Sequence, residues 1–238
     1  MVPRRLISAR MVARSRPAPV GAPHGPCVNQ PMRAISFRFP SSAPRWVLIL
    51  SLAAVANPLS VAAPLQFEGQ TFEDRVVLAG QPLRLNGLGV RAVSVIRGYA
   101  AALYLPQPAT SHAEASGQSG PKRLEIRLLR NVAARELAQA LTRGVSRNST
   151  QTVRDRLADR LQQLTDRFEQ AGSRRKSDTV SLDYLPGQGT ELRINGALQG
   201  PPIPGEDLYD ALLAVFIGAH PADERLRRGL LGLPPAPS

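Results

Sequence analysis

The chain has 238 residues, 43% of them hydrophobic, which suits one globular domain with an appendage. A net charge of +12 is common in nucleic-acid-binding proteins, but residues 1–62 hold eight arginines and no acidic residue, which leaves +4 for residues 63–238. Aromatic residues make up only 5% of the chain, so few side chains can stack on bases, and nucleic acid is not an expected partner.

Residues 1–62 predict an N-terminal extension that contains a secretory signal peptide, with Met32 as the true start of translation. An apolar stretch over residues 46–56 follows three arginines, and small residues at 54–56 or 60–62 fit a cleavage site. The stretch is too short to span a bilayer, so we expect a periplasmic or secreted protein without stable membrane insertion after cleavage. An uncleaved anchor is the alternative. Residues 63–238 are expected to form one domain.

Leu83–Pro106 is the stretch around which this domain is organised. Short strands are predicted before it, within Phe67–Gly80. Residues 92–97 alternate and predict a strand with one wet face. Tyr99–Leu105 is apolar without a break, which predicts a buried strand.

Arg91 interrupts the apolar character of this stretch. It follows Gly87 and Gly89, and glycines inside a strand pattern mark a bulge or the close approach of backbone or ligand. A cation that enters an apolar layer must be paired or must await an anion, because an unpaired buried charge is too costly. Arg91 is therefore the leading candidate for a ligand-binding residue. The alternative is a core arginine that binds backbone carbonyl groups at a bulge.

The next segments predict one loop, one strand and two helices. Ser111–Gly120 is small and polar, as in a surface loop, and the alternation over Lys122–Arg130 predicts a strand with one covered face. Apolar residues four apart predict a helix over Ala133–Arg147. A second apolar stripe predicts another over Gln151–Gln170.

Strands return after these helices, over Thr179–Leu185 and Glu191–Ile194, and Asn195-Gly196 predicts a type I′ hairpin. A helix with acidic residues at its start is expected between Gly205 and Gly218, and a last short one over Asp223–Leu230. This order of elements predicts an α+β fold in which a layer of α-helices covers one face of an antiparallel β-sheet.

Several short motifs occur in a fixed order along the chain: Gly-Leu-Gly-Val-Arg at 87–91, Tyr-Ala-Ala-Ala-Leu-Tyr-Leu at 99–105, Leu-Leu-Arg-Asn-Val at 128–132, Asp-Tyr-Leu-Pro-Gly-Gln-Gly-Thr at 183–190, Ile-Asn-Gly at 194–196, Ile-Gly at 217–218 and Leu-Leu-Gly at 230–232. With them the chain resembles the chalcone isomerase-like family, specifically its bacterial secreted branch, over Phe67–Gly232. The resemblance implies an antiparallel sheet backed by helices, with a ligand cleft between the two layers.

The resemblance also implies roles for single residues. In plant chalcone isomerases the matching strand arginine lies beside the flavonoid cleft, and related fatty-acid-binding members use an arginine there for a carboxylate. That position is Arg91, and a guanidinium offers a two-pronged donor to an anionic oxygen. The catalytic candidates are Arg91 and Tyr99. The ligand-binding candidates are Arg91, Tyr99, Tyr104, Asn148 and Arg130.

Two observations limit these roles. Tyr99 and Tyr104 occupy an odd and an even position of one strand, so at most one of them can line the cleft. Arg130 is expected more as a strand-end contact than as a ligand residue.

The pattern of the plant enzymes is incomplete in this chain. Tyr99 stands where those enzymes have a threonine, and the predicted helix Ala133–Arg147 lacks their tyrosine. Only Asn148 is left to stand in for their asparagine. Ring closure of a chalcone would therefore lack some of the donors that stabilise developing enolate charge.

No metal or cofactor is expected. No two of His24, His112 and His220 have ligand spacing, and the only cysteine, Cys27, lies outside the predicted domain.

We expect the domain to bind a small hydrophobic anion such as a fatty acid, with candidate cleft walls at Leu103, Leu105, Leu137 and Leu141. One alternative is an isomerase (an intramolecular lyase) that acts on an unsaturated ketone or flavonoid-like substrate. Another is a non-catalytic envelope interaction module. The oligomeric state stays open.

Overall fold

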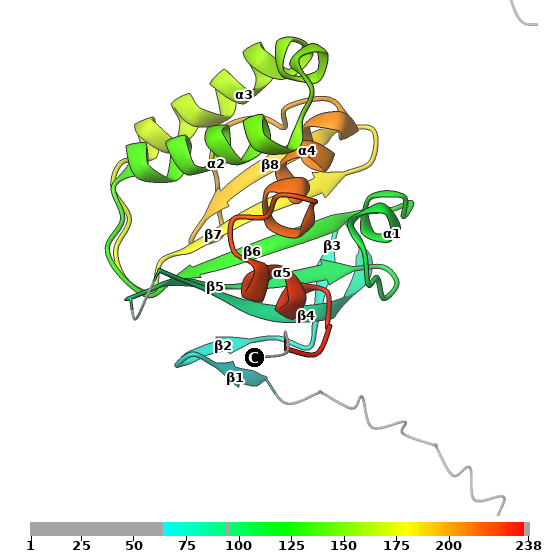
Figure 1. The fold of residues 1–238 in the computed structure, drawn as a ribbon, viewed down its shortest axis with the longest axis vertical. Coiled ribbons are helices and arrows are strands. Elements are labelled where there is room, and N and C mark those ends of the chain that lie inside the picture. The colour runs from blue at the N-terminus through cyan, green and yellow to red at the C-terminus, as the bar shows by residue number, and fades with distance from the viewer. Residues whose placement is uncertain (1–63, 94–95, 236–238) are drawn as a thin grey trace, which may run out of the picture. The chain divides into compact units, whose positions relative to one another are not determined.

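The computed structural model describes residues 64–93 and 96–235, and its centre is one antiparallel sheet (Figure 1). Each strand pairs with the next one along the chain, so the sheet is a meander with the order β3-β4-β5-β6-β7-β8-β9. The strands are β3 Arg75–Leu78, β4 Gln81–Val93, β5 Ile96–Leu105, β6 Lys122–Leu128, β7 Thr179–Leu185, β8 Gly189–Ile194 and β9 Ala197–Leu198. Strands β1 (Leu65–Phe67) and β2 (Gln70–Phe72) form a separate hairpin.

The helices cover one face of this sheet, which confirms the predicted α+β architecture (Figure 1). Helices α2 and α3 follow β6 and pack on each other, α4 contacts both, and α5 lies on β4. Their bounds are α1 His112–Ser116, α2 Ala134–Asn148, α3 Gln151–Ala171, α4 Glu206–Ile217 and α5 Glu224–Leu230. The four predicted helices therefore begin and end within a residue or two of these positions.

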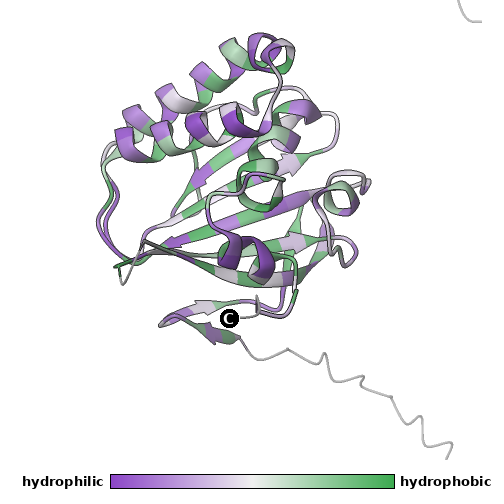
Figure 2. Ribbon diagram, in the orientation of Figure 1, coloured by the Kyte–Doolittle hydropathy of each residue, from purple (hydrophilic) through white to green (hydrophobic). Residues whose placement is uncertain are grey.

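The main core lies between the sheet and the helices. It joins the inward side chains of β5–β8 to those of α2–α5 in one continuous cluster. In Figure 2, α2 and α3 are mostly hydrophilic, with hydrophobic residues at intervals along each helix. In α4, by contrast, nine of the twelve residues are buried. Helix α4 is thus the central helix of the layer, and α2 and α3 shield it from water.

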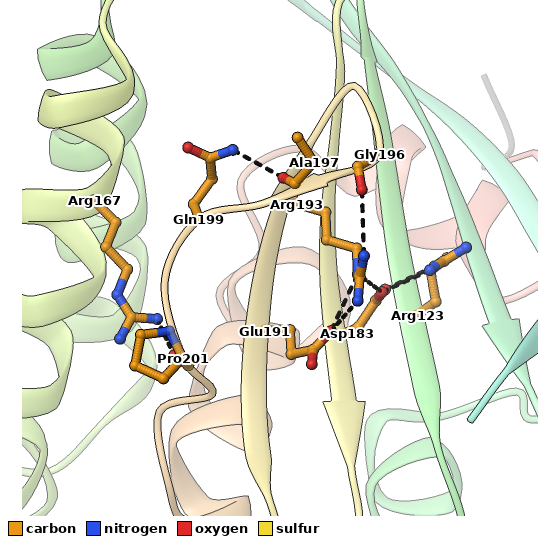
Figure 3. A network of polar contacts seen from close by, with 9 residues as sticks. All are labelled: Arg123, Arg167, Asp183, Glu191, Arg193, Gly196, Ala197, Gln199 and Pro201. Carbon is orange, nitrogen blue, oxygen red and sulfur yellow. Dashed lines mark hydrogen bonds and ion pairs between the residues drawn. The ribbon is translucent and has the colours of Figure 1, made fainter.

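The opposite face of the sheet has a smaller apolar cluster and a charged network. Phe72 of β2 packs there with Leu83 and Tyr104. Asp183 on β7 is fully buried between the guanidinium groups of Arg123 and Arg193 (Figure 3). Charged side chains that lie flat on a sheet can cover one another in this way, because their aliphatic stems exclude water.

The prediction that only one face of the strand at Lys122–Arg130 is covered is wrong. Glu125 belongs to the face predicted to be wet, yet it is buried and accepts a bond from Arg127 Nε at 2.9 Å. Lys122 faces the helices, where its Nζ lies 3.2 Å from Glu206 Oε1 and over the ring of Tyr184. Ion pairing allows charged residues to occupy covered positions that a hydropathy pattern assigns to solvent.

Two further boundaries differ from the prediction. Ala92 pairs with Arg97 and Val93 with Ile96, so the alternation over 92–97 belongs to the facing ends of two strands rather than to one. The predicted loop Ser111–Gly120 contains α1, whose first turn is capped by Ser111 Oγ, which accepts from the backbone N–H of Glu114 at 3.2 Å.

The glycines before Arg91 have the role that their pattern predicts. The register of β4 shifts between Leu85 and Gly87, which is a bulge. Helix α5 also packs against this segment so closely that a methyl group on Gly89 would lie 2.5 Å from the carbonyl oxygen of Leu226. Asn86 adds a bond from its Nδ2 to the carbonyl of Leu230 at 2.8 Å. The bulge and the two glycines fix α5 on the strand that carries Arg91.

The predicted signal peptide and Met32 lie outside the described residues. Within the described part, no helix combines the length and the apolar character needed to cross a membrane.

Candidate functional site

The pairing of β4 with β5 brings Arg91 and Tyr99 together. The two residues stand directly opposite each other in the antiparallel register, so their side chains share one face of the sheet. It is the helix-covered face, where the ring of Tyr99 meets the ring of Phe216 edge to face at 6.5 Å. Both Arg91 and Tyr99 are half-buried.

Arg91 has a donor that the rest of the described protein leaves unused. Its Nε is buried and finds no hydrogen-bond partner within residues 64–93 and 96–235. A core arginine that ties carbonyl groups at a bulge would use such a donor, and this Nε makes no bond of that kind to any described residue. Because buried polar groups are nearly always bonded, an unused donor at the edge of a cavity favours an anionic ligand or ordered water.

Arg91 and Tyr99 line a cavity of about 160 Å³ between the sheet and the helices. Its floor continues from Tyr99 across the sheet through side chains of β6 and β7, namely Ile126, Val180 and Leu182. The roof is formed by helices, from Leu137, Ala140 and Leu141 of α2, Phe168 of α3 and Val215 and Phe216 of α4. Apart from its arginines and the Tyr99 hydroxyl group, this lining is apolar.

The charged side chains that line the cavity are all arginines. Arg143 and Arg147, both exposed on α2, line it together with Arg91, and no aspartate or glutamate stands among the described lining residues. In the described part of the chain, the side chain of Arg143 makes only a long hydrogen bond, from Nη1 to Gln139 Oε1 at 3.4 Å. Three guanidinium groups beside an apolar hollow favour a ligand with an anionic end and a hydrophobic body.

Tyr99 is kept in its neutral form. Burial raises the pKa of its phenol well above the ordinary value, the nearby Arg91 guanidinium lowers it, and Asp223 raises it further. The pKa of Tyr99 is therefore raised overall, and the phenol is protonated at neutral pH. Tyr99 can therefore donate a hydrogen bond to the same oxygen atoms that Arg91 would attract.

Residues 64–232 match the sequence model of the family described as chalcone isomerase-like. The chain belongs to this family. A comparison with curated protein sequences finds no match.

A chalcone isomerase-like fold is also found among solved structures. The crystal structure of a fatty-acid binding protein from Arabidopsis thaliana superposes with a TM-score of 0.55 at 17% sequence identity. The alignment covers 71% of this chain and 96% of the plant protein. Identity at this level shows that the two proteins share a fold.

The other predicted site residues of the chalcone isomerase-like domain lie away from the cavity. Tyr104 is on the opposite face of the sheet, as strand alternation requires, and its hydroxyl donates to the carbonyl oxygen of Glu73 at 3.0 Å. Asn148 ends α2, where its Nδ2 donates to His220 O at 2.8 Å and its Oδ1 accepts from His220 N at 2.9 Å. The side chain of Asn148 thus holds the end of α2 to the segment after α4.

Arg130 is near Arg91 but is occupied. The two arginines line a second, shallower hollow with Ile96 and Gly98, and the guanidinium of Arg130 pairs with Glu136. Among the predicted apolar walls, Leu137 and Leu141 line the main cavity. Leu103 and Leu105 are buried in the same core without reaching it.

Several lining residues were not predicted from the sequence as site residues, notably Arg143, Arg147 and Phe168, the last of which was expected only on the apolar stripe of its helix. A signal existed for the two arginines, because positions 140, 143 and 147 form a stripe beside the apolar stripe of α2. Exposed arginines on a helix are usually solvated, however, and no sequence pattern indicates that these two border a cavity. The described part of the chain holds no group of three or more His, Cys, Asp or Glu side chains placed to bind a metal ion.

Proposed function

We propose that this chalcone isomerase-like protein binds a small hydrophobic carboxylate such as a fatty acid. The observation that carries the proposal is the buried Nε of Arg91, which has no hydrogen-bond partner among the described residues and belongs to a side chain that lines an apolar cavity. The ligand's carboxylate would accept hydrogen bonds from Arg91 and from the phenol of Tyr99, and its hydrocarbon would occupy the space over β5–β7. The shared fold of a plant fatty-acid binding protein supports this assignment. We propose that the protein acts after export, in the periplasm or outside the cell.

The test of this proposal is the variant Arg91→Met, which keeps an unbranched, flexible side chain and removes the charge and the donors. Titration of the purified domain with octanoate should show at least tenfold weaker binding, because the carboxylate would lose a charged donor inside an apolar site. Arg84→Met is the matched control, since Arg84 is exposed on the same strand. Equal affinity of the wild type and Arg91→Met would refute the proposed role of Arg91.

An isomerase is the second candidate, and the pairing of a neutral phenol with a guanidinium favours it. Two such donors could stabilise the enolate formed from an unsaturated ketone. The measurement is the loss of chalcone absorbance with wild-type protein. Turnover that disappears in Tyr99→Phe and Arg91→Met would support catalysis. The third hypothesis, an envelope interaction module, predicts that neither variant changes any ligand-dependent property.

A further inference from the structure

The cavity has a closed end, and its position limits the length of a ligand. From Arg91 on β4 the lining passes over β5 and β6 and stops at β7, where Val180 and Leu182 are 2% and 1% exposed. Neighbouring strands lie about 4.8 Å apart, so the three strand intervals span about 14 Å. A carboxylate bound at Arg91 would take up the first part of that distance, which leaves room for a short hydrocarbon chain.

Phe168 closes the roof of the cavity from α3. It is 3% exposed and lies within the main core, so this part of the lining is covered from solvent. The exposed lining residues are Arg143 and Arg147, which place the mouth on the side of α2. A chain too long for the cavity would therefore have to emerge beside guanidinium groups and water, where additional methylene groups gain little from burial.

The volume of the cavity also indicates a short hydrocarbon chain. An engineered protein cavity of about 150 Å³ holds benzene, which has six carbons. The cavity beside Arg91 measures about 160 Å³ and continues into an open mouth. It can enclose about six carbons completely and a few more in part.

We infer that the site selects carboxylates with short to medium hydrocarbon chains of about six to ten carbons, and that Phe168 sets this limit. The inference rests on the proposed function. Phe168 would act through the space that it fills and would make no contact with the carboxylate. A smaller residue at 168 should admit a longer chain, and a larger residue at Ala140, on the same lining, should admit only a shorter one.

The experiment measures affinity for a series of saturated acids from butanoate to hexadecanoate, with each acid kept below its micelle concentration. Affinity should rise about fourfold for each methylene group up to eight to ten carbons and then stop rising. We call the chain length at which affinity stops rising the break. In Phe168→Leu the break should move to longer acids by about two carbons. In Ala140→Leu, which adds volume and keeps a good helix former, it should move to shorter ones.

Phe72→Leu is the matched control, because Phe72 packs in the apolar cluster on the opposite face of the sheet. It should leave the break in place. A steady rise through hexadecanoate, or a break that neither cavity variant moves, would overturn the chain-length inference while leaving carboxylate binding intact. Absence of binding at every length, or binding that Arg91→Met does not weaken, would overturn the proposed function itself.

Discussion

Asp183 is the residue on which the charged face of the sheet depends. Arg123 binds its carboxylate with two donors, Nε to Oδ1 at 2.7 Å and Nη2 to Oδ2 at 2.6 Å. Arg193 lies 3.6 Å from Oδ2 and also pairs with Glu191 (Figure 3). The carboxylate is fully buried, so its charge depends on these partners for compensation.

We expect Asp183→Ala to lower the free energy of unfolding by about 3–5 kcal/mol, because it leaves the Arg123 guanidinium largely covered and unpaired. Replacing both partners, as in Arg123→Met with Asp183→Leu, should cost far less, since neither charge of this pair is left without its partner. Urea unfolding of Asp183→Ala, of Arg123→Met and of the double variant measures the difference. A double variant at least as unstable as Asp183→Ala would contradict this account.

At the residue scale, the sequence indicates those site residues whose signal is local. Arg91 and Tyr99 can be identified because a charge and a phenol stand out in apolar strands, and their pairing follows once the strands are in register. Arg143 and Arg147 cannot, because their place at the cavity depends on how α2 packs on α4. That packing is close: a methyl group on Gly144 would collide with Val215, a residue of the cavity lining.

At the scale of elements, the contact between α5 and β4 determines where Arg91 is held. We expect Gly89→Ala to destabilise the domain by about 1–3 kcal/mol, because the added methyl group would meet the backbone of α5. It should also weaken octanoate binding, since the strand that presents Arg91 would shift with α5. Urea unfolding and the ligand titration check both effects.

Gly98→Ala is the control for this variant. Among the described residues, an added methyl group there would have only the carbonyl oxygen of Arg91 nearby, at 3.5 Å, and should change stability little. Equal stability of Gly89→Ala and the wild type would show that α5 is not fixed by this contact.

The glycine pair illustrates how far element-scale prediction reaches. The spacing of Gly87 and Gly89 predicts a bulge or a close approach, and both occur. It cannot predict that the approaching backbone belongs to α5, since that contact joins distant parts of the chain. The end of β4 at Val93 is missed for a related reason, because the alternating pattern continues on β5.

At the scale of the whole molecule, the order of strands and helices is sufficient to predict the architecture. A meander sheet pairs each strand with its sequence neighbour, so few alternative topologies compete. The cavity could not be predicted in the same way. Its volume depends on the balance between small and large side chains, such as Ala140 and Phe168, that meet only after folding.

Export is the prediction that belongs to this scale. When the full chain is produced in a bacterium, we expect the protein recovered from the periplasm to begin at Asn57 or Ala63, after one of the two small-residue sites. N-terminal sequencing checks this. Placing arginine at Leu48 and Leu50 should block export, because the apolar stretch would be broken. An N-terminus upstream of residue 54 on the exported protein would favour an uncleaved anchor instead.

Helix α5 is seated on β4, and Arg225 Nη2 donates to the carbonyl oxygen of Ala92 at 3.2 Å, one residue from Arg91. A fusion partner or affinity tag joined close behind Leu233 would therefore be expected to disturb α5 and, through it, the position of β4, which carries Arg91. Ligand binding is best measured on protein without such additions. A tag that weakens binding would itself indicate that the contact between α5 and β4 controls the position of Arg91.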